Sequence, residues 1–368
     1  MKFTCEKVLL QAACSVAARA AASKSPIPAL EGLELCAGDR LSVKGYDLKK
    51  AIVTGLDAEI AQKGSVVVGA RLFGEMIRRL PDGMVEVSVD EKDSVSVRCG
   101  KSHFDILGIS AADYPELPSF DAVNSVALPQ RVLKDMINRT LFAVSADEVR
   151  PIYTGTLFEI EGEELTLVSV DGYRLAKRTE KLEGAEMEQC SFVVPGSTLS
   201  DVEKICGDED EPIRLAVGSK HVSFSVGDTV VISRRLEGEF LNYRKSIPEE
   251  FQHEIRVDKG ELLASIDRVS LIVSEKNSSP VRLTLNDGTI DLLCTTPIGR
   301  AEDVCTCEGS GEGMLIGFND RYMKDALRAA GTDELLLCVN TASSPCIIRA
   351  ADGGDSFTYM VLPVRLHA

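Results

Sequence analysis

The sequence predicts an α+β protein in which one unit, made of antiparallel sheets and two helices, occurs three times. Three observations lead to this prediction. A helix pattern with one apolar face recurs at 7–21, 131–145 and 260–274. A β-hairpin pattern follows each of these helices, and a second helix pattern follows each hairpin. The copies are about 125 residues apart, so the chain of 368 residues holds three of them.

The first helix is clearest in the middle copy, which reads RVLKDMINRTLFAVS over 131–145. Val132, Leu133, Met136 and Ile137 recur at spacings of three and four, which predicts a helix that buries one face. Pro129 stands just ahead of it, where the beginning of a helix accepts proline.

Strands and second helices then follow in the same order in every copy. Apolar and polar residues alternate on both sides of a turn at 33–43, 157–167 and 283–292, as in a β-hairpin. The short links favour antiparallel sheets with both helices packed on one side. Second helices are predicted at 70–80, 196–206 and 319–330, and each copy ends with a strand, at 103–108, 229–236 and 357–366.

Two segments that contain Pro and Tyr are natural linkers between the copies. They lie at 111–120 and 238–248. Linkers of this composition commonly separate domains. We therefore predict three domains, at 1–120, 121–248 and 249–368.

Composition indicates a cytoplasmic protein that is not inserted in a membrane. No apolar run is long enough for a transmembrane helix, and charged residues interrupt the N-terminal segment where a signal peptide needs an apolar core. The eleven cysteines have no regular spacing, which favours reduced thiols.

Charge is unevenly distributed along the chain. The net charge is −16, yet the six predicted helices are mildly basic and the remaining segments carry the acidic excess. If the helices line one surface, they form a sequence-independent track for phosphates. Ordinary solvated helix faces would explain the same residues.

No catalytic motif is complete, so we predict no catalysis, no cofactor and no metal site. Gly100-Lys101-Ser102 resembles the end of a phosphate loop, but the required first glycine is replaced by Val95. The pair Cys305 and Cys307 lacks zinc-ligand spacing. A nucleotide-dependent enzyme acting at Gly100–Ser102 remains a rival hypothesis.

Three similar units in a row leave two unlike ends, which could meet a second copy head to tail. Phe104 and Ile106 lie on the last strand of the first unit. Ile272 and Val273 lie at the end of the first helix of the third unit. We predict that these four residues form an interface between two copies.

Two other stretches stand out from the repeat. SVDGYRLAKR, at 169–178, breaks the strand alternation with a glycine, and KGYDLKKA at 44–51 is its counterpart. A turn shared by Gly45-Tyr46 and Gly172-Tyr173 would explain both, while Arg174 and Leu175 occur only in the second copy. The apolar stretch YMVLPVRL runs almost to the chain end, where residues are rarely buried unless something holds them.

Six motifs in order, distributed over the whole chain, resemble the bacterial sliding clamp family, the beta subunits of DNA polymerase III. They are MKFTCEK, VRPIYTGTLFE, SVDGYRLAKR, GEFLNYRKSIP, IGFNDRYMKDAL and the terminal LPVRL. The resemblance implies a head-to-tail homodimer that forms a six-domain ring, with helices around duplex DNA and sheets outside.

The resemblance also implies a pocket that binds peptides of the replicative polymerase, the clamp loader and repair proteins. Its residues would be Tyr153, Val170, Gly172, Tyr173, Arg174, Leu175, Leu241, Ser344, Met360, Leu362, Pro363, Val364 and Arg365. An apolar notch of this kind would receive Leu or Phe side chains, and strand-like backbone would supply hydrogen bonds.

Lumen residues that would contact DNA, carried over from the same resemblance, are Lys24, Arg71, Arg78, Arg139, Arg150, Tyr153 and Lys204. The chain departs from the family pattern at Tyr173, at Gly196-Ser197 and at Leu241. We therefore expect a processivity clamp without catalysis of its own. The alternative is an interaction scaffold that uses the same repeats but does not bind DNA.

Overall fold

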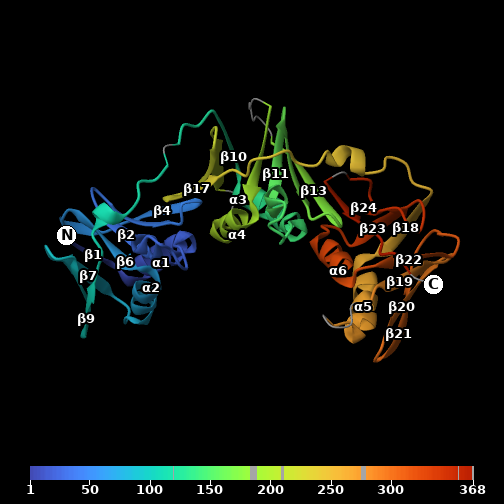
Figure 1. The fold of residues 1–368 in the computed structure, drawn as a ribbon, viewed down its shortest axis with the longest axis horizontal. Coiled ribbons are helices and arrows are strands. Elements are labelled where there is room, and N and C mark those ends of the chain that lie inside the picture. The colour runs from blue at the N-terminus through green and yellow to red at the C-terminus, as the bar shows by residue number, and fades with distance from the viewer. Residues whose placement is uncertain (119, 183–188, 209–210, 275–278, 355, 367–368) are drawn as a thin grey trace. The chain divides into compact units, whose positions relative to one another are not determined.

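The structure is a computed structural model that describes residues 1–118, 120–182, 189–208, 211–274, 279–354 and 356–366 (Figure 1). The chain divides into two compact units. The first comprises Met1–Leu133 and Asp201–Arg235, and the second comprises Lys134–Ser200 and Leu236–Ala368. The middle repeat contributes to both units because its two sheets each continue into a different neighbouring repeat.

The first unit contains two sheets in the described part of the chain. A five-stranded sheet has the order β5-β1-β7-β8-β9, and an eight-stranded sheet has the order β10-β15-β16-β17-β4-β3-β2-β6. Their strands are β1 (Lys2–Glu6), β2 (Gly32–Ala37), β3 (Leu41–Tyr46), β4 (Lys50–Leu56), β5 (Glu59–Gln62), β6 (Gly64–Gly69), β7 (Met84–Val89), β8 (Ser94–Cys99), β9 (Ser102–Leu107), β10 (Asn124–Pro129), β15 (Pro212–Val217), β16 (His221–Val226) and β17 (Thr229–Arg234).

The second unit also contains two sheets among its described residues. One has the order β14-β11-β12-β13-β25-β24-β23-β18, and the other has the order β21-β20-β19-β22. Their strands are β11 (Gly155–Glu161), β12 (Glu164–Val170), β13 (Arg174–Lys181), β14 (Cys190–Pro195), β18 (His253–Asp258), β19 (Val281–Leu285), β20 (Thr289–Thr296), β21 (Gly299–Thr306), β22 (Met314–Phe318), β23 (Glu334–Val339), β24 (Cys346–Ala350) and β25 (Phe357–Val361).

Each repeat has the two predicted helices. They are α1 (Lys7–Ala17), α2 (Ala70–Arg79), α3 (Gln130–Asn138), α4 (Gly196–Ile205), α5 (Lys259–Val269) and α6 (Asp320–Ala329). In the first unit α1 packs on β4 and beside α2, and in the second α5 packs on β21 and beside α6 (Figure 1). All the strand pairings described are antiparallel, which confirms the predicted fold class of α+β repeats.

The first helix of each repeat is shorter than predicted. The helix predicted over 131–145 ends at Asn138, and a single 3-10 turn, Leu141–Ala143, follows it. The Thr140 hydroxyl donates to the Met136 carbonyl at 2.8 Å, which replaces a helical backbone bond with a side-chain bond. The 3-10 turns Ala18–Ala20 and Ser270–Ile272 follow the other two first helices directly.

Continuity of the sheets across repeats was not predicted. Strand β17 of the second repeat pairs with β4 of the first, with Val231 opposite Ile52. Strand β25 of the third repeat pairs with β13 of the second, with Met360 opposite Leu175. Consecutive repeats are therefore joined by backbone hydrogen bonds as well as by side chains.

Candidate functional site

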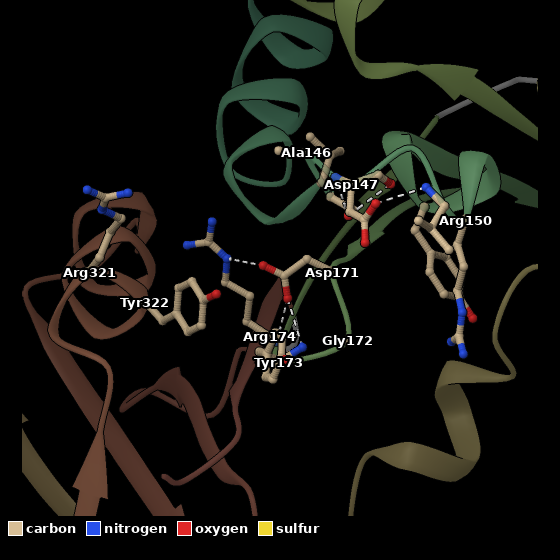
Figure 2. A pocket seen from close by; sticks show the side chains of 13 residues that line it. Ala146, Asp147, Arg150, Asp171, Gly172, Tyr173, Arg174, Arg321 and Tyr322 are labelled. Atoms are coloured by element: carbon tan, nitrogen blue, oxygen red, sulfur yellow. Dashed lines mark hydrogen bonds and ion pairs between the residues drawn. The ribbon is translucent and has the colours of Figure 1, made fainter. Parts of the chain in front are cut away.

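A hollow of about 610 Å³ lies in the second unit, beside the turn between β12 and β13 and the beginning of α6 (Figure 2). Residues of the second and third repeats line it: Val144, Ser145, Ala146, Asp147, Val149, Arg150, Tyr153, Asp171, Gly172, Tyr173, Arg174, Arg321 and Tyr322. Tyr153, Gly172, Tyr173 and Arg174 of the predicted pocket are among them. We name this hollow the junction pocket.

Arg174 is the centre of the junction pocket. Its Nε donates to Asp171 Oδ2 at 2.9 Å, and its Nη1 donates to Asp325 Oδ2 at 2.6 Å. Its guanidinium also lies over the rings of Phe142 and Tyr322, at 5.4 and 4.5 Å from their centroids. Since only 11% of the Arg174 side chain is exposed, these contacts are little weakened by water.

Two tyrosines give the pocket an aromatic wall. Tyr173 is exposed and its ring stacks on Tyr322, with the centroids 6.2 Å apart and the planes at 23°. Burial and then the nearby Asp171 carboxylate raise the pKa of Tyr322, so its hydroxyl stays protonated and can donate at neutral pH. The pocket therefore offers both an apolar surface and a hydrogen-bond donor.

A tight turn positions Tyr173 and Arg174. The Asp171 carboxylate accepts from the backbone N–H of both residues, at 2.8 and 2.9 Å, and the N–H of Asp171 donates to the Arg174 carbonyl at 3.3 Å. Gly172 has φ +93, a conformation that glycine adopts without strain. Aspartate followed by glycine therefore determines the local geometry.

The prediction that Gly45-Tyr46 forms the equivalent turn is wrong, because both residues lie within β3. A Cβ at Gly45 would stand 2.0 Å from the Ala17 carbonyl oxygen, so this glycine permits close packing of a helix on the strand. The equivalent turn is Asp47–Lys50, where Asp47 accepts from the N–H of residues 49 and 50 and donates its own N–H to the carbonyl of Lys50.

An apolar cluster forms the base of the site. Val170, Leu175 and Met360 are buried in it, and Tyr153 and Leu362 pack against it. The Leu362 N–H donates to the Tyr173 carbonyl at 2.9 Å, which holds the C-terminal segment beside the turn. Five of the thirteen residues predicted for the pocket thus belong to one cluster formed by two repeats.

The C-terminal strand ends earlier than predicted. Strand β25 stops at Val361, two residues before Pro363, which has no N–H for a strand ladder. Beyond it, Pro363, Val364 and Arg365 line a second hollow of about 730 Å³, and the Val364 N–H donates to the Gly317 carbonyl at 2.8 Å. Hydrogen bonds from outside the strand therefore hold this segment in place.

The remaining predicted pocket residues lie outside both hollows. Leu241 is 40% exposed, and Ser344 lies in the turn after β23, where its N–H donates to the Thr341 carbonyl. Sequence reasoning missed Tyr322, Arg321, Asp147 and Val149, which do line the junction pocket. A signal for Tyr322 was present, since it stands in the motif IGFNDRYMKDAL.

The predicted lumen residues differ in exposure and in the bonds of their side chains. Lys24, Arg71, Arg78, Arg150 and Lys204 are exposed, and Arg78 Nη2 donates to Glu75 Oε2 at 2.7 Å. The half-buried Arg139 donates from Nε to Asp135 Oδ1 at 2.6 Å and from Nη1 to the Ala329 carbonyl at 3.0 Å. Its guanidinium thus stabilises the second unit, and Tyr153 packs on the apolar cluster.

The four residues predicted at the interface between copies are unequally exposed. Phe104 is 42% exposed, while Ile106, Ile272 and Val273 pack against the cores of their own repeats. Their neighbours Leu107 and Leu271 are 85% and 83% exposed. Phe104 is therefore the most exposed of the four residues, and the neighbouring Leu107 and Leu271 are more exposed still.

Gly100-Lys101-Ser102 is not a phosphate loop, because the glycine has φ +56 in the hairpin turn between β8 and β9. A phosphate loop instead joins a strand to the N-terminus of a helix. Among the described residues, no three His, Cys, Asp or Glu side chains are grouped so that they could hold a metal ion. The helices in that part of the chain are all too short or too polar to cross a membrane.

Comparison with known proteins assigns the family. Sequence profiles of the N-terminal, central and C-terminal domains of the DNA polymerase III beta subunit match residues 1–118, 127–242 and 244–365. The beta sliding clamp of Bacillus subtilis is 32% identical over 379 aligned residues, which cover both chains completely. The chain belongs to the DNA polymerase III beta subunit family.

Solved structures of the clamp family agree. The DNA polymerase sliding clamp from Bacillus subtilis matches with a TM-score of 0.96 at 31% identity, and the DNA polymerase III beta subunit from Thermotoga maritima matches with a TM-score of 0.92 at 27% identity. Both comparisons cover 100% of each chain. The chain is therefore a clamp of three repeated domains.

Proposed function

We propose that this clamp encircles duplex DNA as a head-to-tail homodimer and tethers the replicative DNA polymerase to its template. The observation that supports it most strongly is the full-length match to beta sliding clamps, which extends over all three repeats. In this function the protein is not an enzyme. A closed ring holds DNA by topology, so its individual phosphate contacts can be weak enough to permit sliding.

Unpaired sheet edges support the proposed dimer. Within the described sheets, β9 is an edge strand of the first unit and β21 is an edge strand of the second. The equivalent strands at the joined repeats pair with each other, as β17 pairs with β4 and β25 pairs with β13. Since an exposed edge can pair with another chain, β9 of one copy suits β21 of the other. Phe104, Ile106, Ile272 and Val273 remain our proposed interface residues.

For the junction pocket we propose binding of extended peptides from the polymerase, the clamp loader and repair proteins. Tyr173 and Tyr322 offer apolar stacking surface, and the segment after β25 lies beside them, because the Leu362 N–H donates to the Tyr173 carbonyl. We propose the thirteen predicted residues, together with Tyr322, as this site.

For DNA we propose contacts to the exposed cations among the predicted residues, with Arg78 and Arg139 the weaker candidates because their guanidinium groups already bond to carboxylates. We also propose the domain boundaries 1–120, 121–248 and 249–368 and a cytoplasmic location. The profile matches begin and end within a few residues of these boundaries, which supports them.

Retention on circular DNA tests the clamp function. The protein is loaded onto nicked circular DNA with a bacterial clamp loader, and bound protein is separated by gel filtration. We expect retention on the circle and release after the DNA is cut to a linear form, because a ring slides off an end. Equal loss from both forms would support the scaffold that does not bind DNA.

Truncation of the C-terminus tests the pocket. Deletion of 364–368 removes the exposed Val364 and Arg365 beyond β25, whereas deletion of 360–368 also removes the buried Met360 and Val361. We expect the shorter deletion to weaken binding of a clamp-binding polymerase peptide at least ~10-fold while the dimer persists. Unchanged peptide affinity would exclude this segment from the site.

A further inference from the structure

The two junctions between consecutive repeats share an ion pair in the same place. Lys50 bonds to the Asp201 carboxylate, and Arg174 bonds to Asp325. Each cation is the last residue of a hairpin turn, and each carboxylate is the sixth residue of a second helix, α4 or α6. Lys50 is only 7% exposed, so its pairing with Asp201 is largely shielded from water.

Strand register identifies the same positions at the two open ends of the chain. The hairpin of β20 and β21 pairs Thr295 with Arg300 and then Thr296 with Gly299, and the hairpin of β12 and β13 pairs Val170 with Leu175, beyond which the Asp171 N–H donates to the Arg174 carbonyl. The residue at the position of the cation is therefore Gly299. The cation position is thus occupied by Lys50, Arg174 and Gly299. The carboxylate position is occupied by Asp201, Asp325 and Glu75.

At the open end of the first repeat the carboxylate position holds Glu75. At the open end of the third repeat the cation position holds Gly299, which carries no charge. Glu75 bonds to Arg78 of its own helix at 2.7 Å and lies 3.4 Å from Arg79. Arg78 holds the pKa of Glu75 below its usual range, so this carboxylate is charged at neutral pH.

A second pair of equivalent positions carries apolar side chains. At the junction of repeats two and three, Tyr173 stacks on Tyr322, the third residue of α6. The third residue of α2 is Leu72, and the residue before Gly299 is Ile298. Leu72 is 61% exposed and Ile298 is 71% exposed, so both side chains are accessible to another copy of the chain.

We propose that Leu72 of one copy packs against Ile298 of a second copy, as Tyr322 packs against Tyr173. This junction between copies lacks the ion pair that is present at the two junctions within one chain. The proposal rests on the head-to-tail dimer proposed above. Strand pairing and an apolar contact then hold two copies together, while Glu75 has no opposing cation at the position of Gly299. The surface that fits Leu72 is thus the β20–β21 hairpin of another copy of this chain.

The missing cation can be restored without strain. A Cβ added at Gly299 meets no heavy atom within 4 Å, and the residue is not in the left-handed region of φ. Gly299→Arg would place a guanidinium where Arg174 stands in the preceding repeat. Glu75 of the second copy is the acceptor that the equivalence assigns to it.

Dimer dissociation of the full chain tests the proposal, measured by sedimentation velocity and by exchange of fluorescently labelled subunits. We expect Leu72→Ser and Ile298→Ser each to raise the dimer Kd at least ~10-fold. The double variant should raise the Kd by less than the product of the two single effects, because both substitutions remove the same contact. Val123→Ser, at an aliphatic residue that is 72% exposed, is the matched control and leaves the Kd unchanged. Gly299→Arg should lower the Kd about tenfold, and Glu75→Gln should remove that gain.

The outcomes separate this proposal from the dimer itself. A dimeric parent protein with unchanged Kd in both serine variants overturns the Leu72–Ile298 contact and leaves the ring intact. A gain from Gly299→Arg that persists with Glu75→Gln overturns the assigned ion-pair position. A parent protein that is monomeric at micromolar concentration overturns the head-to-tail dimer as well.

Discussion

Arg174 shows how one side chain can join two repeats. It bonds to Asp171 of its own repeat and to Asp325 of the next, and it lies against Phe142 and Tyr322. The sequence comparison between copies singled out this arginine, because the first copy has no arginine there. Its partners could not be predicted, since Asp325 lies 151 residues away and only the folded chain brings it near.

Replacing Arg174 should destabilise the second unit. In Arg174→Ala, two partly buried carboxylates lose their cation, and we expect the free energy of unfolding to fall by about 2–4 kcal/mol. Scanning calorimetry measures the loss as a lower transition temperature. Arg174→Lys is the matched variant, which keeps the charge but not the planar fork, and it should recover only part of the stability. Equal stability of all three proteins would contradict the structural role of the guanidinium.

Asp228 gives a pH-dependent contact within the first unit. A hydrogen bond from Arg40, 2.7 Å from its Oδ1, lowers the pKa of this carboxyl. A lowered folded-state pKa stabilises the fold above the unfolded value of about 3.9, and this stabilisation is lost as pH falls through the folded value. We expect Asp228→Asn to lower Tm by about 1–2 °C at pH 7, because the pair is exposed, with the difference fading below about pH 4.

Thermal unfolding between pH 7 and pH 3 measures the Asp228 effect. Asp57 also contacts Arg40, at 3.1 Å, but it is far more exposed, so Asp57→Asn is the matched control with a smaller effect. A Tm difference for Asp228→Asn that is independent of pH would rule out charge as its source.

The beginnings of the helices were predictable from the repeat. Each of the six helices begins within one residue of its predicted position, because cap residues and apolar spacing are local signals. The ends of the first helices were overestimated, since the apolar residues continue into the 3-10 turns and keep helical spacing there. Sheet continuity was missed because backbone hydrogen bonding at a strand edge leaves no side-chain pattern.

The beginning of α6 connects helix capping with the junction pocket. Asn319 Oδ1 accepts from the N–H of Arg321 and of Tyr322, at 3.0 and 3.3 Å. We expect Asn319→Ala to lower the free energy of unfolding by about 1 kcal/mol and to weaken peptide binding, because Tyr322 is in the first turn. Denaturant unfolding and a peptide titration measure the two effects, and Asn319→Asp, which keeps the cap, should preserve both. Peptide affinity that survives loss of the cap would separate Tyr322 from the site.

Across the whole molecule, the threefold repeat places equivalent residues at equivalent positions, yet these residues have different partners. A carboxylate is the sixth residue of every second helix, at Glu75, Asp201 and Asp325, and this was readable from the aligned copies. Its role was not readable, because two of the three meet a cation from another hairpin and the third meets arginines of its own helix. Burial and partner choice are properties of the assembled sheets.

Electrostatics of the molecule as a whole lead to a last prediction, on DNA binding. Each cation that neutralises a phosphate contributes about one unit to the slope of log affinity against log salt. Lys24→Ala and Arg71→Ala should each lower this slope by about one unit for a short linear duplex, measured by fluorescence anisotropy. Lys101→Ala, at an exposed lysine in a hairpin turn, is the control.

Arg139→Ala should leave the slope unchanged but lower Tm, because its guanidinium bonds to Asp135 and to the Ala329 carbonyl. If Arg139→Ala changes the slope and Arg71→Ala does not, the helix surface that we assign to DNA is the wrong one.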